Sequence, residues 1–88
     1  MTNPAYPAEE APYAFSRYRC YIFRFYASDR PERPHMHVLK GGQEAKIWLS
    51  PVELAWNHGY NTREINHILR LARENESRLL RIWHEYFK

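Results

Sequence analysis

The chain has 88 residues, enough for one domain with a single modest hydrophobic core. Its hydrophobic content of 44% and aromatic content of 16% exclude a disordered chain, and its one cysteine excludes an intramolecular disulfide bond. No segment approaches the roughly 18 continuous apolar residues of a membrane span. Residues 1–16 lack the basic start and apolar run of a signal peptide, so we expect a cytoplasmic protein. The net charge of +3 suits an acidic partner such as nucleic acid or an acidic protein, with ordinary solubilising charge as the alternative.

The N-terminal segment is rich in proline and poor in bulky apolar residues, which predicts a flexible arm over residues 1–12 before a domain over residues 13–88. Aromatic and β-branched residues follow closely in Tyr18–Ala27, YRCYIFRFYA, and predict the first strand. Residues 28–34 are polar and contain two prolines, which predicts a loop.

Two further strands are predicted at His35–Lys40 and Gln43–Leu49, joined by a hairpin turn at Gly41-Gly42. Side chains alternate between the two faces of a sheet, so the sequence can be sorted by face. One face would be apolar, with Tyr21, Phe23, Phe25, Met36, Val38, Ala45, Ile47 and Leu49. The other would carry Arg24, Tyr26, His35, His37, Leu39, Glu44, Lys46 and Trp48. We therefore expect a core face and an opposite face of cations, imidazoles and aromatic rings.

The next segment has two interpretations. Serine, proline and glutamate in Ser50–Glu53 are typical of a helix start, and Gly59 could end a short helix. Val52, Leu54 and Trp56, however, alternate with other residues as in a fourth strand.

The C-terminal segment has a helical pattern. Asn61 or Thr62 can cap a helix whose apolar residues recur at helical spacing to about Tyr86, and a bend near residues 75–77 would follow from the polar interruption there. The elements together predict an α+β fold: an antiparallel three- to four-stranded sheet with one face packed by a long C-terminal helix.

Several motifs resemble the small bacterial proteins grouped as domain of unknown function 4160. The matching residues are Pro34–His37, Gly41–Gly42, Glu44–Ile47, Asn75, Leu79, Leu80, Trp83, Tyr86 and Phe87. The resemblance spans about residues 15–87 and implies a strand at Val52–Asn57. No activity is established for the family. Its members are often proposed to be toxin components of bacterial toxin–antitoxin pairs. It implies a partner from a neighbouring gene, a small protein of the domain of unknown function 2442 type.

His35 and His37 are two residues apart on the predicted strand, so their side chains would share one face. Two imidazoles can act as general base and general acid on a phosphodiester, while Lys46 stabilises the charge on the phosphoryl oxygens. These three residues are the predicted catalytic set of a metal-independent ribonuclease. The residues predicted to hold the RNA, by phosphate contact or base stacking, are Arg24, Tyr26, Arg30, Arg33 and Trp48.

Other interpretations use the same face. Noncatalytic binding of RNA, DNA or a protein needs no tuned imidazole and accommodates Glu44 more easily. A metal site would combine His35 and His37 with a third ligand, for which the candidates are His58, His84, Glu44 and Cys20. No spacing completes such a site, no cofactor is expected, and the histidines could instead simply brace the hairpin. The leading hypothesis is a toxin–antitoxin-type component whose His-x-His face binds RNA, with cleavage as a further step; a protein-interaction or DNA-binding module is the alternative.

Overall fold

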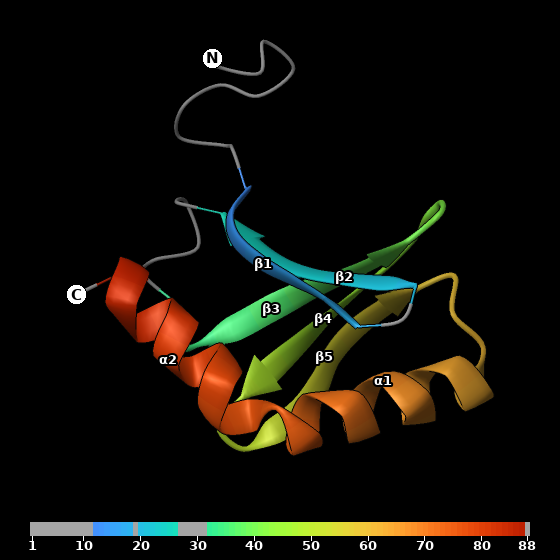
Figure 1. Ribbon diagram of the computed structural model, residues 1–88. Helices are drawn as coiled ribbons and strands as arrows, with labels where there is room; N and C mark the ends of the chain where they lie inside the picture. Colours follow the sequence, from blue (N-terminus) through green and yellow to red (C-terminus); the bar gives the residue numbers. More distant parts are fainter. Residues whose placement is uncertain (1–11, 19, 27–31, 88) are drawn as a thin grey trace, which may run out of the picture.

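The computed structural model describes residues 12–18, 20–26 and 32–87, and it contains a five-stranded sheet. The strands are β1 (Pro12–Tyr18), β2 (Tyr21–Tyr26), β3 (His35–Lys40), β4 (Gln43–Leu49) and β5 (Val52–His58). They lie in chain order and each pairs antiparallel with the next, which gives a simple meander (Figure 1). The predicted α+β fold is confirmed.

The structure adds one strand to those predicted. The segment expected to form a single strand over Tyr18–Ala27 is divided, because Tyr18 ends β1 and pairs with Tyr21 at the start of β2. The predicted N-terminal arm lies outside the described residues, except Pro12, where β1 begins.

The ambiguous segment after β4 is a strand, as the family resemblance implied. Its pairing with β4 shifts register between Lys46 and Ile47, since Ile47 lies opposite Leu54 while Lys46 lies opposite Trp56. Ala55 is therefore an extra residue, a β-bulge. The bulge moves Trp56 to the same side of the sheet as Lys46, where strict alternation from Val52 would not have placed it.

The turn after β5 is fixed by side chains. Asn57 accepts a hydrogen bond from the N–H of Tyr60 at 3.1 Å and donates one to its carbonyl at 2.9 Å. Gly59 has φ +106°, and a Cβ there would lie 3.1 Å from the side chain of Gln43. Glycine therefore suits this position on both counts.

Two helices follow, α1 (Thr62–Glu74) and α2 (Glu76–Tyr86). Asn61 and Glu64 form a reciprocal capping box at the start of α1. The expected single long helix is divided at Asn75, whose side-chain amide donates to the Leu71 carbonyl at 2.8 Å. Among the described helices, none is long and apolar enough to cross a membrane.

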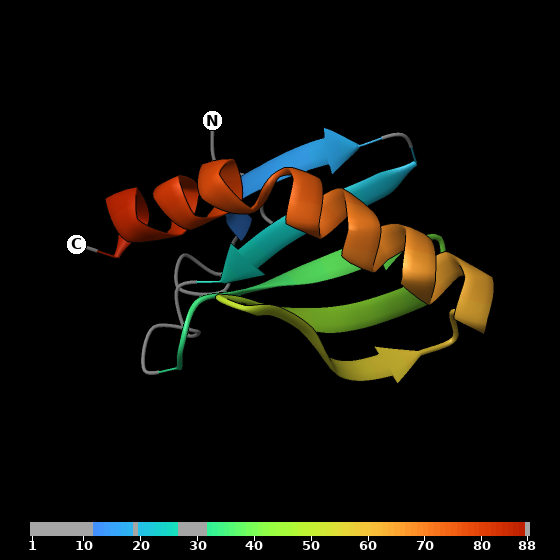
Figure 2. The same cartoon turned by 90° about the horizontal axis from the view of Figure 1, so that it is seen from below.

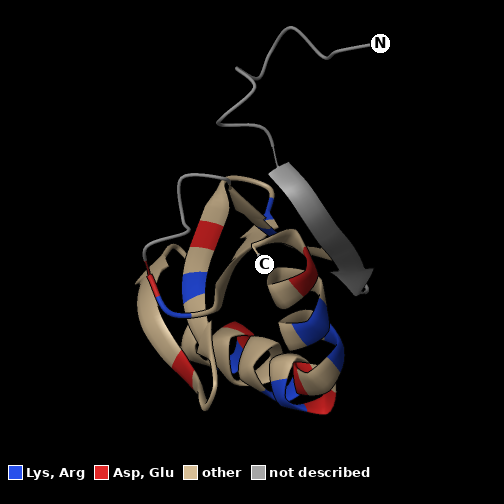
Figure 3. Cartoon of the chain, turned by 90° about the vertical axis from the view of Figure 1, so that its left-hand side faces the viewer, with Lys and Arg blue, Asp and Glu red and all other residues tan. Residues whose placement is uncertain are grey.

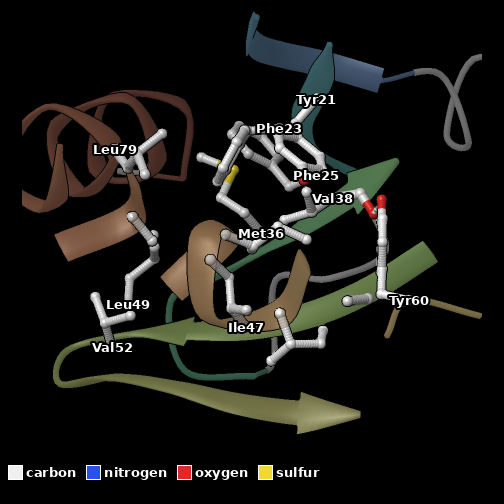
Figure 4. Packing of buried hydrophobic residues seen from close by; sticks show 14 of the residues in the cluster. Tyr21, Phe23, Phe25, Met36, Val38, Ile47, Leu49, Val52, Tyr60 and Leu79 are labelled. Carbon is white, nitrogen blue, oxygen red and sulfur yellow. Dashed lines mark hydrogen bonds between the residues drawn. The ribbon is translucent and has the colours of Figure 1, made fainter. Parts of the chain in front are cut away.

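The helices run diagonally across one face of the sheet (Figure 2). Every predicted core residue of the strands is buried there, and Ile68, Ala72, Leu79 and Trp83 meet them from the helices. Figure 4 shows how these side chains interlock, with the Tyr60 hydroxyl donating to the Val38 carbonyl at 2.9 Å. The burial of Tyr60 raises the pKa of its hydroxyl. The apolar rows of the sequence are therefore the core of the protein.

Ile47 and Leu54 lie opposite each other, which gives a matched pair for testing this packing. Ile47 is completely buried, while Leu54 is 39% exposed on the edge strand β5. We expect Ile47→Ala to lower the free energy of unfolding by about 2–5 kcal/mol, because it leaves a cavity. Leu54→Ala should cost about 1 kcal/mol or less. Urea unfolding followed by circular dichroism measures both, and equal losses would contradict the assigned register.

An ion pair ties the sheet to α1. The Lys40 ammonium donates to Glu64 at 3.0 Å, and this bond, with that from the Asn61 N–H, lowers the pKa of Glu64. A depressed carboxyl pKa stabilises the fold above the unfolded-state pKa, and this contribution is lost as pH falls through the folded-state value. We expect Glu64→Gln to be less stable than wild type near pH 7, with the difference shrinking toward pH 3. Urea titrations across this range test it, and a difference independent of pH would contradict it.

Candidate functional site on the open face of the sheet

The side of the sheet away from the helices is ordered in rows by the strand register. Directly paired residues of antiparallel strands share a face, with Cβ atoms about 4.5–5.5 Å apart. The central row is Arg24, His37, Lys46 and Trp56, one residue each from β2, β3, β4 and β5. We call the open face the following set, of which the last two residues come from the loop before β3: Arg24, Tyr26, His37, Leu39, Glu44, Lys46, Trp48, Glu53, Trp56, His58, Glu32 and Arg33.

His37 lies at the centre of this face. Its Nδ1 is 3.2 Å from a carboxylate oxygen of Glu44, and its side chain is 12% exposed. Because a carboxylate only accepts, Nδ1 carries the proton in this contact. The rings of Tyr26, at 5.2 Å between centroids, and Trp56, at 6.0 Å, flank the imidazole. The imidazole of His37 is thus fixed by Glu44 and largely enclosed by the two neighbouring rings.

His35 is next to His37, but it is not accessible. The two rings are 5.3 Å apart between centroids, which confirms that they lie together. His35 is nevertheless 0% exposed, and its ring is 4.9 Å from that of Trp83 on α2 and 5.7 Å from that of Trp48. The expectation that both imidazoles lie on a side left uncovered by the helix is wrong for His35.

The reason lies in the pairing of the strands. The described β2–β3 ladder runs from Ile22–Leu39 to Arg24–His37, and His35 lies beyond its end. There the imidazole is enclosed between the aromatic rings of the open face and those of α2. Its Nδ1 donates to the Arg33 carbonyl at 2.9 Å, so the ring also holds the loop before β3. We therefore assign His35 a structural position at the end of the sheet.

The loop before β3 reaches the open face because it is bonded to β4. The N–H of Leu49 donates to the Pro34 carbonyl at 3.0 Å. This bond brings Glu32 and Arg33 beside β4, where Glu32 accepts a hydrogen bond from Lys46. Arg33 lies 3.8 Å from a carboxylate oxygen of Glu53.

Carboxylates therefore accompany the cations of this site. Lys46 is bonded to Glu32 with its side chain only 12% exposed, and Arg33 adjoins Glu53. Figure 3 colours the acidic and basic residues of the chain, and both kinds occur on the strands. The predicted face of cations therefore also carries carboxylates: Lys46 and Arg33 have acidic partners in reach, while Arg24 contacts none among the described residues.

Aromatic rings make up the rest of the face. The Trp48 ring lies under two cations, with Arg33 at 4.6 Å and Lys46 at 4.7 Å from its centroid. The Arg24 guanidinium lies 5.3 Å from the centroid of Tyr26, and its Nε makes no hydrogen bond with the described residues. These cation–π contacts fix the rings and the cations together.

The structure adds residues to the predicted site and leaves one prediction outside it. Trp56 and His58, whose rings are 4.7 Å apart between centroids, join the open face, as do Glu32 and Glu53 from the loop and β5. The bulge in β5 hid Trp56 from an alternation argument. Arg30, a predicted RNA contact, lies outside the described residues.

The predicted metal ligands do not converge. Within residues 12–18, 20–26 and 32–87, no group of three or more histidine, cysteine or acidic side chains could hold a metal ion. Cys20 is exposed in the turn between β1 and β2, and His84 is exposed on α2. Neither adjoins His35 and His37 in the described contacts. Glu44 contacts His37 at 3.2 Å but completes no such group among the described residues.

The comparisons with known proteins agree with the sequence motifs. Residues 20–84 match the family model described as a domain of unknown function (DUF4160). No curated protein and no solved structure matches the chain. The match covers most of the chain, including β2 to β5, α1 and all but the last turn of α2. The chain therefore belongs to the family called domain of unknown function 4160.

Proposed function

We propose that this protein is a noncatalytic binding module whose open face binds a partner protein. The observation that carries the proposal is the pairing of charges around aromatic rings: Lys46 with Glu32 and Arg33 near Glu53, both cations lying over Trp48. Tyrosine, tryptophan and arginine are enriched in protein–protein interfaces, and they supply most of the residues whose loss weakens binding strongly. A surface with internally compensated charge also avoids burying isolated ions under a partner.

Nucleic-acid affinity would need a different charge pattern. Most of it comes from lysine and arginine side chains that neutralise phosphates and release counterions. Lys46 already has a carboxylate partner in Glu32, and a phosphate would have to compete with that contact. Glu44 and Glu53 add negative charge to the same face. These features favour a protein over an RNA backbone.

Cleavage by two imidazoles also finds little support in the geometry. A general acid and a general base must both come within hydrogen-bond reach of the substrate. His35 is completely buried and donates to the Arg33 carbonyl. Of the two predicted catalytic histidines, only His37 is therefore near the surface of the protein. For this reason we assign the two histidines a structural role, in which they fix the conformation of the open face.

The partner we propose is the small protein of the domain of unknown function 2442 type. This assignment depends on the family resemblance, which associates neighbouring genes of the two families in toxin–antitoxin-type pairs. Binding of such a partner over the open face would cover Trp48, Trp56 and Tyr26.

RNA is the second candidate ligand, because one observation favours it. The Arg24 guanidinium lies over Tyr26, and no carboxylate contacts it among the described residues. An antiparallel sheet that presents aromatic rings can stack the bases of a single strand. The same variants can distinguish the two ligands.

We expect Trp56→Ala to weaken partner binding at least tenfold, because it removes a large ring from the central row of the open face. Titration calorimetry with the purified protein encoded beside this one measures the change. Leu54→Ala is the matched control, since Leu54 is on the same strand but pairs with the core residue Ile47. Circular dichroism should show that both variants keep the fold. Equal binding by wild type and Trp56→Ala would contradict the proposed surface.

Salt dependence separates the protein and RNA hypotheses. Partner binding should change less than about threefold between 50 and 200 mM NaCl, because Lys46 and Arg33 already have carboxylate partners. Single-stranded RNA, titrated by tryptophan fluorescence, should not bind this face. RNA binding that is lost in Trp56→Ala, or RNA cleavage that is lost in His37→Ala, would overturn the noncatalytic protein-binding proposal.

A further inference from the structure

A second surface of the protein lies on the outer side of α1, away from the sheet. Residues of α1 line a hollow of about 520 Å³ there. Figure 2 shows α1 on the side of the molecule that faces the viewer. The lining residues are Thr62, Arg63, Asn66, His67 and Arg70. We call this set the α1 hollow.

Helical spacing brings these residues together. Residues three or four apart are neighbours on a helix surface, and Arg63, Asn66, His67 and Arg70 follow that spacing. The buried stripe of the same helix, Ile65, Ile68 and Ala72, faces the sheet. The α1 hollow is therefore a continuous polar surface that the core does not use.

The cations of this hollow have no acidic partner among the described residues. Within the described part of the chain, neither Arg63 nor Arg70 has an ion pair or a hydrogen bond through its side chain. The adjacent acid, Glu64, is occupied: one oxygen accepts from Lys40 at 3.0 Å and the other from the Asn61 N–H at 3.1 Å. This is the reverse of the open face, where carboxylates adjoin Lys46 and Arg33.

The remaining lining groups can complete an anion site. The Thr62 hydroxyl and the Asn66 amide are hydrogen-bond donors, and an arginine guanidinium matches the geometry of phosphate oxygens. The ring of His67 packs edge-on against that of Tyr21, with centroids 5.5 Å apart, so its position is fixed from below.

We propose that the α1 hollow binds a phosphate ester, with Arg63 and Arg70 as its principal ligands. The phosphate can belong to a nucleic-acid backbone or to a free nucleotide, since both present the same group. The inference does not depend on the proposed function of the open face, because the two surfaces are on opposite sides of the sheet and share no residue.

The test is a titration of the ¹⁵N-labelled protein, followed by amide chemical shifts, with three probes: inorganic phosphate, adenosine monophosphate and a single-stranded RNA 10-mer. We expect saturable shifts over residues 62–70 with at least one probe. Binding of the mononucleotide identifies a nucleotide site, and binding of the 10-mer alone identifies a backbone contact. If no probe shifts these amides, the proposal is wrong.

Charge-matched double variants show whether the hollow itself is responsible. Arg63→Gln with Arg70→Gln should weaken binding at least tenfold, and for RNA should reduce the slope of log K against log salt by about 1.4, as expected for two lost phosphate contacts. Arg73→Gln with Arg81→Gln removes the same charge from exposed positions outside the hollow, and should weaken binding less than threefold. Equal losses in the two double variants would overturn the site in favour of general charge attraction. Trp56→Ala should leave binding unchanged, which keeps this test separate from that of the open face.

Discussion

The pairing of β3 with β4 determines both what the protein buries and what it presents. These strands are joined by the turn at Gly41, whose φ of +59° suits glycine, and Val38 lies opposite Ala45 while His37 lies opposite Lys46. Because a shift of one residue would exchange the two faces of a strand, the core and the open face cannot be changed independently. The same register that buries Val38 under the helices aligns the row from Arg24 to Trp56.

The chemical character of the open face depends on contacts between distant parts of the chain. The loop before β3 is tied to the end of β4 by the bond from Leu49 to Pro34, and this tie brings Glu32 to Lys46. Without that carboxylate, Lys46 would be a cation on an aromatic sheet, which is the pattern of a nucleic-acid surface. With it, the ammonium is held against Trp48 and its charge is offset. One loop contact therefore changes the class of ligand that the surface suits.

Local patterns predicted the parts of the fold that depend on local rules. Alternation identified the buried rows, and the capping residues at Asn61 marked the start of α1. Two features escaped because they depend on tertiary contacts or backbone irregularity: the bulge that reorients Trp56 and the covering of His35 by Trp83. The polar interruption predicted a bend near residues 75–77, and the structure divides the helix there, at Asn75. His35 and His37 lie together, as their spacing predicts, but their exposure could not be read from spacing, because burial of His35 depends on a residue 48 positions later.

The distribution of paired and unpaired charge distinguishes the two surfaces more clearly than composition does. A net charge of +3 describes the whole chain and does not say where a ligand binds. On the sheet, cations such as Lys46 contact carboxylates, so a ligand there gains mainly from ring contacts and the exclusion of water. On α1, Arg63 and Arg70 make no ion pair within the described residues, and the neighbouring acid, Glu64, is bonded to Lys40. The capping box and the Lys40 contact, which stabilise α1, thus also leave its outer arginines available, so the stability of this helix and its proposed affinity for phosphate depend on the same carboxylate.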